Sequence, residues 1–313
     1  MIEGKEMREE RYRPASNGEG QIMTYAWKVD SPKGIVVFLH DQGNYALFYN
    51  SMAEYLNQNG YDVYAADMVG HGLSKQGHSG SFGMKKGGFS AVVEDVHNLV
   101  MDAKRKSGSS IPKVLIGIGL GSVVAMTYTA KYKDVEALAL FSVPNSPKMA
   151  KFIRVAAKQH VRRNGYYSIS ESVASMITQL DSIPGNKEER RYFWFSTDES
   201  EVQAYNEDPD CGQVLSAGSY LELLDAHQKL KGKNGIAQIP DIPVLIMAGA
   251  EDQLGDCGDA AGQLDALFTS KTKHSRVDMK LYPGAYHDIL HDKCKDSVLK
   301  NLVSWMARNV TEE

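Results

Sequence analysis

The sequence predicts an α/β fold in which helices cover both faces of a mostly parallel sheet. Short apolar runs rich in β-branched residues alternate with helical patterns through the first half of the chain. This alternation is typical of parallel sheets. It stops over residues 145–235 and resumes after Pro240. With 313 residues, 42% of them hydrophobic, the chain is long enough to bury a large core.

The predicted elements follow from periodicity. Continuous apolar runs of four to seven residues indicate buried strands, and apolar residues at helical spacing indicate amphipathic helices. The predicted strands cover residues 34–40, 61–66, 113–116, 135–141, 244–247 and 277–282, and the predicted helices cover 47–58, 88–104, 121–131 and about 293–308.

The domain organisation is predicted as one core interrupted by an insertion. Residues 1–144 and 236–313 form the two parts of the core. Residues 145–235 contain helical segments, tandem aromatics at 192–195 and many charges, but no buried strand pattern. A structureless loop of that length is improbable in a compact domain. We therefore expect 145–235 to be a helical cap insertion.

Composition narrows the possible partners. A net charge of −4 gives no electrostatic reason to expect nucleic acid or an anionic membrane. The three cysteines have neither metal-ligand nor disulfide spacing, which suits a reducing compartment. No signal-peptide pattern and no apolar run of about 18 residues is present. We expect a cytoplasmic protein with a small-molecule ligand, without a cofactor or a metal.

A glycine-rich turn follows the third predicted strand. Residues 117–121 read Gly-Ile-Gly-Leu-Gly and precede a small-residue helix. Such a turn has the geometry of a nucleophile elbow, whose flanking residues must lack bulk. The N–H of Leu120, near a helix N-terminus, would point at a developing oxyanion. Gly119 stands at the centre of this turn. The turn alone is a weak signal, because such turns also serve close packing.

Other polar residues follow strands that end at the same edge of the sheet. His40, Asp41 and Gln42 follow the first buried strand, where a second oxyanion donor belongs. Asp252 follows the first strand after the insertion, and His287 follows the last one. The order of elbow, acid and histidine is that of the hydrolase fold. Open parallel sheets bind ligands at this edge.

With these motifs, the chain resembles the monoacylglycerol lipase and bacterial lysophospholipase branch of the α/β-hydrolases, often described as serine aminopeptidase-like. The resemblance runs from about residue 21 to 308 and is strongest at 61–74 (Tyr-Asp-Val-Tyr-Ala-Ala-Asp-Met-Val-Gly-His-Gly-Leu-Ser) and 281–287 (Leu-Tyr-Pro-Gly-Ala-Tyr-His). It implies a Ser-Asp-His triad with Asp252 as the acid and His287 as the general base. It also implies oxyanion donors at the backbone N–H groups of Gln42 and Leu120.

Two departures from the family stand at the site. The elbow reads Gly-His-Ser-Met-Gly in the family, so that its serine falls on Gly119. The oxyanion motif His-Gly-X-Gly falls on 40–43, with Asp41 at the second position. Without a side chain at 119 no acyl-enzyme can form. Replacements at Asp41 and Ile118 favour natural divergence over an engineered single substitution.

No other residue is an obvious substitute nucleophile. Ser122 is expected to be a small packing residue one helical turn beyond the elbow. Ser142 ends the following strand, and Cys257 lies five residues past Asp252. Neither is at the elbow. A weaker hypothesis is direct hydrolysis, without a covalent intermediate, by a water that His287 activates. Separately, His40 and Asp41 are candidate residues of the ligand pocket.

Three functions compete. The first is an ester or lipid hydrolase framework that is inactive as written, and that a Gly119→Ser substitution is expected to restore. The second is a natural pseudoenzyme that binds an acyl or other small ligand under its cap. The third is an aminopeptidase-like hydrolase, suggested only by the customary label of the family.

Overall fold

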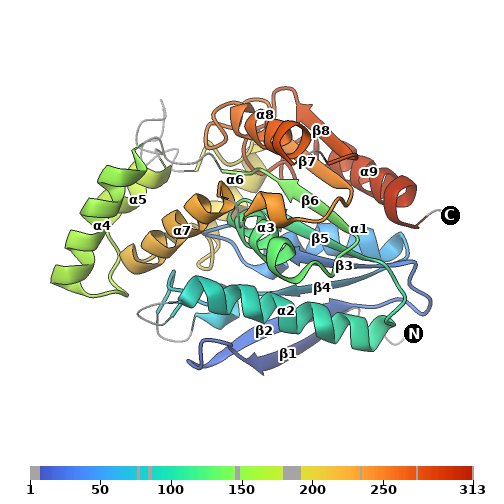
Figure 1. The fold of residues 1–313 in the computed structure, drawn as a ribbon, viewed down its shortest axis with the longest axis horizontal. Helices are drawn as coiled ribbons and strands as arrows, with labels where there is room; N and C mark the ends of the chain where they lie inside the picture. The colour runs from blue at the N-terminus through green and yellow to red at the C-terminus, as the bar shows by residue number, and fades with distance from the viewer. Residues whose placement is uncertain are drawn as a thin grey trace.

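One eight-stranded sheet organises the molecule in the computed structural model (Figure 1). The structure describes residues 8–75, 78–83, 87–144, 149–178, 192–232, 235–272 and 274–311. The strand order is β1-β2-β4-β3-β5-β6-β7-β8, and β2 pairs antiparallel with β1 and with β4, whereas the pairs from β4 to β8 are parallel. The strands are β1 (Glu9–Pro14), β2 (Gln21–Trp27), β3 (Gly34–Leu39), β4 (Tyr61–Ala66), β5 (Lys113–Ile118), β6 (Ala137–Phe141), β7 (Val244–Gly249) and β8 (Val277–Tyr282).

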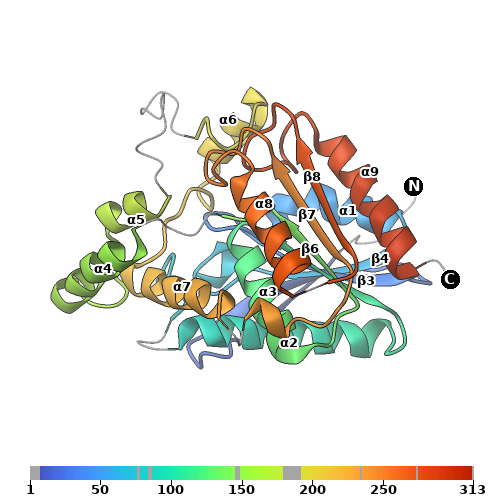
Figure 2. The same ribbon diagram turned by 45° about the horizontal axis from the view of Figure 1, so that its top comes forward.

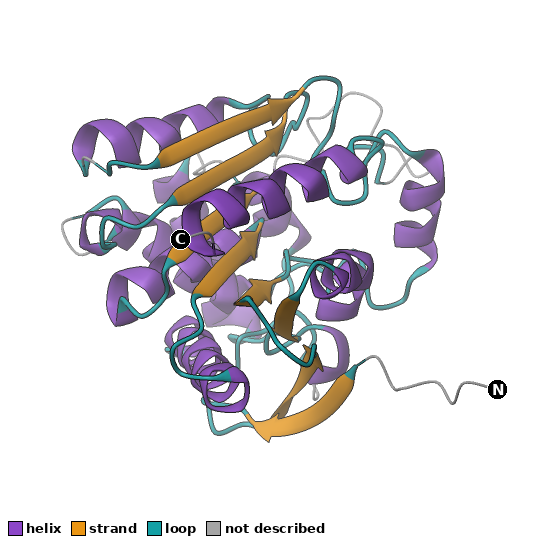
Figure 3. Ribbon diagram, turned by 90° about the vertical axis from the view of Figure 1, so that its right-hand side faces the viewer, coloured by secondary structure: helices purple, strands orange, loops and turns teal. Residues whose placement is uncertain are grey.

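Helices connect the parallel strands and cover the sheet on both sides (Figure 3). They are α1 (Asn50–Gln58), α2 (Gly88–Ser107), α3 (Leu120–Tyr132), α4 (Ala150–Asn164), α5 (Glu171–Thr178), α6 (Glu199–Glu207), α7 (Ala217–Leu230), α8 (Asp259–Ala266) and α9 (Lys295–Met306).

The sheet separates two hydrophobic clusters. Alternate residues of β3 point to opposite faces, so that Ile35, Val37 and Leu39 join one cluster and Val36 and Phe38 join the other. The first cluster contains side chains of α2, α3, α7 and α8, and the second contains those of α1 and α9. Because both faces are buried, the central strands read as continuous apolar runs.

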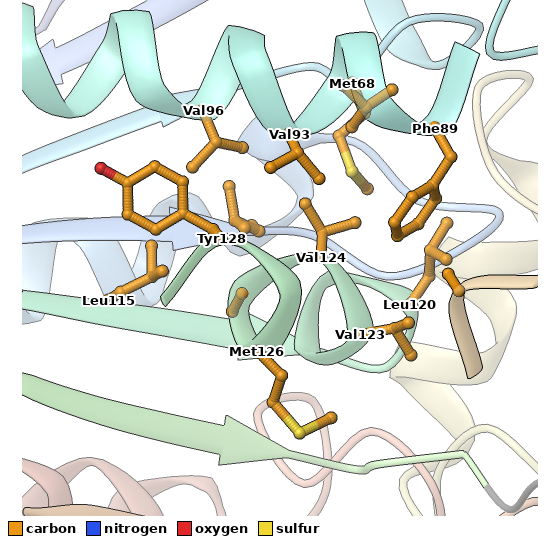
Figure 4. Close-up of a cluster of buried hydrophobic side chains, with 14 of the residues drawn as sticks. Met68, Phe89, Val93, Val96, Leu115, Leu120, Val123, Val124, Met126 and Tyr128 are labelled. Carbon is orange, nitrogen blue, oxygen red and sulfur yellow. The ribbon is translucent and has the colours of Figure 1, made fainter. Parts of the chain in front are cut away.

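Helix α3 is packed tightly against the sheet and α2. Figure 4 shows Leu120, Val123 and Val124 of α3 near Phe89 and Val93 of α2, all of them buried. Nine of the 13 residues of α3 are buried, which explains why a helix of small and β-branched residues forms here. Tertiary packing stabilises it more than intrinsic propensity does. The position of Leu120, at the start of this helix, is therefore fixed by the core.

The predicted strands and helices are present, with ends that differ by a few residues. Two strands were not predicted: β1, which is mostly exposed, and β2, which pairs antiparallel with β4. β1 consists mostly of charged and exposed residues and has no apolar face. Its sequence therefore shows no alternation of apolar and polar residues that would predict a strand. No helix within the described ranges is both long and apolar enough to cross a membrane.

The predicted insertion 145–235 lies between β6 and β7 and holds α4, α5, α6 and α7. Residues 145–148, 179–191 and 233–234 of this range lie outside the described residues. Its described part contributes no strand to the sheet, only an isolated bridge between Ile169 and Ser216. In Figures 1 and 2, α4 and α5 lie far from the sheet, while α7 runs back toward α3. We propose, as the sequence predicts, that residues 145–235 form a separate cap domain.

Glycines allow α3 to approach the loop after β3. A Cβ at Gly121 would lie within 3.0 Å of the backbone carbonyl groups of Leu39 and His40. A Cβ at Gly117 would lie 2.5 Å from the Cα of Ser122. Because both residues lack a Cβ, the loop at 40–42 can lie next to the start of α3.

We predict that Gly121→Ala lowers the free energy of unfolding by about 1–3 kcal/mol, because the added methyl group must displace backbone atoms. Gly262→Ala is the matched control, since Gly262 also lies inside a helix and a Cβ there would meet nothing within 4 Å. This control should gain up to about 1 kcal/mol from helix propensity. Urea denaturation of both variants measures the difference. Equal effects would contradict the tight approach at Gly121.

Candidate active site

The predicted site residues converge at one edge of the sheet. Asp41 and Gln42 follow β3, Gly119 follows β5, Asp252 follows β7, and His287 follows β8. β3, β5, β7 and β8 all run in the same direction, so that their carboxyl ends meet there.

The elbow has the backbone conformation that its glycines suggest. Gly119 has φ 52° and ψ −116° and directly precedes α3. Residues other than glycine rarely adopt this backbone conformation without strain. Its N–H donates to the carbonyl of Phe141 at 2.9 Å, and its carbonyl accepts from the N–H of Ser122 at 3.0 Å. The bend is therefore held from both sides.

The carboxylate of Asp41 lies between the two predicted oxyanion donors. The backbone N–H groups of Gln42 and Leu120 both donate to its Oδ1, each at 2.6 Å. Charge-assisted bonds of this length are the stronger kind. The two N–H groups for which the sequence analysis predicts the role of oxyanion donors thus converge on one point, and a side chain of the protein itself occupies it.

The same carboxylate faces the histidine. Nε2 of His287 lies 3.1 Å from Oδ2 of Asp41, and Nδ1 lies 3.0 Å from Oδ1 of Asp252. Asp252 is completely buried, and its Oδ1 also accepts from the N–H of Leu254. The imidazole therefore bridges two carboxylates, one at the position predicted for the acid and one at the oxyanion donors.

Gly119 and Asp41 depend on each other sterically. A Cβ built on Gly119 would lie within 3.0 Å of Cγ and of both oxygens of Asp41. No side chain fits at 119 while Asp41 keeps this position. The position of the Asp41 carboxylate is thus compatible with glycine at 119 but not with serine.

The surroundings of His287 favour its protonated, positively charged form. Burial alone would lower its pKa, but the charges of Asp252 and Asp41 and their hydrogen bonds raise the pKa well above its ordinary value. Both ring nitrogens then donate, one to each carboxylate. With two carboxylates and one imidazolium, the group has a net charge of −1.

His40 takes a supporting position instead of the pocket position expected for it. It is completely buried, and its Nε2 accepts from the N–H of Met68 at 2.9 Å. Its Nδ1 lies 2.8 Å from the carbonyl of Asp41. Burial lowers the pKa of His40 to about 3, so that it stays neutral. The ring therefore fixes the backbone that carries Asp41.

None of the substitute nucleophiles considered from the sequence reaches the elbow. Ser122 is buried and donates to the carbonyl of Gly117 at 2.7 Å, which confirms its packing role. Ser142 donates to the backbone carbonyl of His287 and so supports that loop. Cys257 is exposed, and its N–H donates to the carbonyl of Asp252.

The sequence predicted that the inserted segment covers the site as a cap, but not which of its residues contact the site. The carbonyl of Trp194 accepts from the N–H of His287 at 3.4 Å, and its ring lies 5.5 Å from the imidazole. The hydroxyl of Tyr220 accepts from the side chain of Gln42 at 2.9 Å. The aromatic cluster at 192–195 was visible in the sequence, but nothing there placed it beside His287. Within the described ranges, no group of three or more His, Cys, Asp or Glu residues is arranged to hold a metal ion.

This fold and this edge define an α/β-hydrolase. Among solved structures, a thermostable carboxyl esterase from Bacillus coagulans, in complex with glycerol, superposes with a TM-score of 0.87 at 22% identity, covering 97% of this chain and 99% of that one. A soluble variant of monoglyceride lipase from Saccharomyces cerevisiae gives a TM-score of 0.75 at 19% identity, covering 99% and 97%. At such identities the likeness concerns the fold.

Residues 30–294 match the family described as "Serine aminopeptidase, S33", and the chain belongs to it. Its relatives include a monoacylglycerol lipase of Mycolicibacterium smegmatis, 25% identical over 299 residues, with 95% of this chain and 96% of that protein covered. The monoglyceride lipase of Mus musculus is 26% identical over 305 residues, with 94% and 89% covered.

We predict that the pKa of His287 lies above that of a free histidine and that Asp41→Asn lowers it, because one of the two carboxylates that stabilise the cation is removed. Histidine ¹⁵N NMR spectra across a pH titration measure both. The folded-state pKa exceeds the unfolded value near 6.5. This contribution to stability is therefore full below about pH 6.5 and is lost as the pH rises through the folded pKa.

Urea denaturation should accordingly show a steeper loss of stability above pH 6.5 for the unmodified protein than for Asp41→Asn. If the free energy of unfolding changed with pH equally in both proteins, or if the ring were neutral in the unmodified protein at pH 7, there would be no ion pair between Asp41 and His287.

Proposed function

We propose that this protein binds a small, neutral acyl-bearing molecule at the His287 edge and does not hydrolyse esters through the acyl-enzyme route of serine hydrolases. The observation that carries the proposal is the carboxylate of Asp41, hydrogen-bonded to the N–H groups of Gln42 and Leu120 and to His287.

Three requirements of that route fail together. Gly119 has no atom that could attack a carbonyl carbon. The donor pair that would stabilise a tetrahedral oxyanion is already engaged by Asp41. The raised pKa of His287 favours its protonated form, which cannot take a proton as general base. The last two points also argue against water activated directly by His287.

The mutual fit of Gly119 and Asp41 supports natural divergence. A single Ser→Gly substitution in an ordinary hydrolase would leave a glycine at 41 and an empty donor pair. Here a carboxylate lies where the missing side chain would be and uses the donors that it exposes. We infer that the two positions changed together and that the arrangement serves the present function.

The relatives and the inserted segment support an acyl ligand. Several relatives are named as monoacylglycerol or monoglyceride lipases. Beside His287, Trp194, Phe195 and Tyr205 form a buried cluster against which Phe48 and Leu254 pack. Apolar and aromatic side chains with a few polar groups are typical of small-molecule sites. The negative charge of the Asp41–His287–Asp252 group favours a neutral ester over a free fatty acid.

An aminopeptidase-like activity remains a weaker candidate. An acidic site could attract a substrate amine, but the carboxylates of Asp41 and Asp252 are both engaged by His287. The proposal of an acyl ligand therefore stands ahead of it.

We predict that Gly119→Ser alone stays unlabelled by a fluorophosphonate probe, because Asp41 fills the space and the donors that the serine needs. This differs from the expectation from sequence, in which that single change is sufficient. The double variant Asp41→Gly/Gly119→Ser should be labelled and should cleave p-nitrophenyl butyrate about 10³-fold faster than the unmodified chain.

Asp41→Gly alone is the matched control. It frees the donors without supplying a nucleophile, and so it should stay unlabelled. Thermal melting verifies that all three variants fold. Labelling of the single Gly119→Ser variant at the rate of the double variant would show that Asp41 does not block the site. A folded but inert double variant would contradict the hydrolase framework itself.

We predict that 1-octanoylglycerol raises the melting temperature of the unmodified protein more than sodium octanoate does, since the site has a net negative charge. At about 100 times Kd, a ligand that binds only the folded state stabilises by about 2.7 kcal/mol. For a chain of this size that corresponds to about 5 °C. Thermal melting with both compounds measures it, and no shift with either would contradict acyl binding.

A further inference from the structure

The carboxylate of Asp41 is held as a nucleophile would be. Its Oδ1 is fixed by the N–H groups of Gln42 and Leu120, while Oδ2 accepts one hydrogen bond, from His287. A carboxylate oxygen has a second lone pair. The side chain is 13% exposed, whereas those of His287 and Asp252 are 4% and 0% exposed. Of these three groups, Asp41 is the one that an incoming molecule can reach.

We infer that Asp41 is a carboxylate nucleophile and that this site hydrolyses small apolar epoxides to vicinal diols. The inference uses the residues of the proposed acyl site, but it does not depend on acyl binding. It goes beyond the proposed function, because it assigns a reaction to the carboxylate that excludes ester hydrolysis.

The first step opens the strained ring. Oδ2 of Asp41 attacks a ring carbon, a C–O bond forms, and the ring C–O bond breaks with its electron pair on the epoxide oxygen. That oxygen takes the proton of the His287 imidazolium. The products are a hydroxyalkyl ester on Asp41 and a neutral His287. An epoxide fits this site because ring opening needs an acid, and the resting histidine supplies one.

The second step releases the diol. Neutral His287 takes a proton from water, and the hydroxide attacks Cγ of the Asp41 ester. The negative charge develops on Oδ1, which already accepts from the N–H groups of Gln42 and Leu120. Collapse expels the diol oxygen, which is protonated by His287. The new carboxylic acid of Asp41 returns a proton to His287, and the net reaction is epoxide plus water to diol.

The charges of the site match this sequence of acid and base. While Asp41 is ionised, its charge contributes to the raised pKa of His287, which favours the imidazolium needed for ring opening. Esterification removes that charge, so that the pKa of His287 falls and the ring can act as base. Asp252, buried and bonded to Nδ1, holds the ring in place throughout as a positioning residue.

The surroundings offer a further donor and an apolar contact. The indole N–H of Trp194 is buried without a hydrogen-bond partner among the described residues, on a ring 5.5 Å from that of His287. An unpaired buried donor is costly and invites an acceptor. The epoxide oxygen is such an acceptor. The buried aromatic rings of Phe195 and Tyr205 lie in the same cluster, so that this side of the site is apolar.

The experiment traps the covalent ester. Full-length protein in excess is mixed with styrene oxide or 1,2-epoxyhexane in ¹⁸O-water for one turnover. Diol is then quantified, and the peptide that contains residue 41 is analysed by mass spectrometry. We expect diol that carries no ¹⁸O and one ¹⁸O atom in Asp41. His287→Gln should stop at the ester and show the mass of the epoxide on Asp41.

Variants separate this reactivity from general effects. Asp41→Ala should form no ester and should lower diol formation at least about 100-fold. Glu251→Gln is the matched control, because Glu251 is an exposed carboxylate next to Asp252 in sequence, and it should behave like the unmodified protein. Thermal melting checks that each variant folds.

Two results would overturn the inference. One is a folded His287→Gln variant without an adduct on Asp41 for either epoxide. The other is alkylation confined to other residues, such as the exposed Cys257. Neither result touches the proposed function, which is tested by fluorophosphonate labelling and by melting with 1-octanoylglycerol. Conversely, loss of acyl binding would leave the epoxide experiment unchanged.

Discussion

The site depends on one interaction, the capture of the Asp41 carboxylate by two backbone N–H groups and an imidazolium. Backbone donors at a helix start and a cation beside them form a strong anion site. In this chain the anion is a side chain of the protein. Its presence requires the missing side chain at Gly119 and explains the positive charge of His287. Without that carboxylate, these two features of the site have no common explanation.

The rest of the fold keeps these groups within reach of each other. His40 holds the loop of Asp41 in place, because its ring contacts the backbone of Met68 and of Asp41 itself. Leu120 begins a helix packed into the core, and Gly121 lets that helix approach the strand before the loop. Parallel strands bring the separate loops to one edge. The backbone that carries the two N–H groups is therefore held by contacts on several sides.

The sequence predicted the parallel strands well, because strands buried on both faces read as apolar runs. It missed β1, whose charged, exposed residues carry no such pattern. That Gln42, Leu120, Asp252 and His287 lie close together followed from motifs at strand ends. The direction of the Asp41 side chain did not, because a residue type at a loop position does not fix its rotamer. The contact of Trp194 with His287 joins segments nearly one hundred residues apart and could not be read from local patterns.

The protonation state separates this site from a serine triad built on the same framework. In a triad the resting imidazole is neutral and acts first as a base, with one carboxylate behind it. Here a second carboxylate lies on the other side of the ring, so that the cation is favoured and the ring is suited to act first as an acid. The change at residue 41 thus does more than block a pocket. It reverses the order in which the same histidine can give and take a proton, and so favours substrates whose first step needs an acid and a carboxylate together.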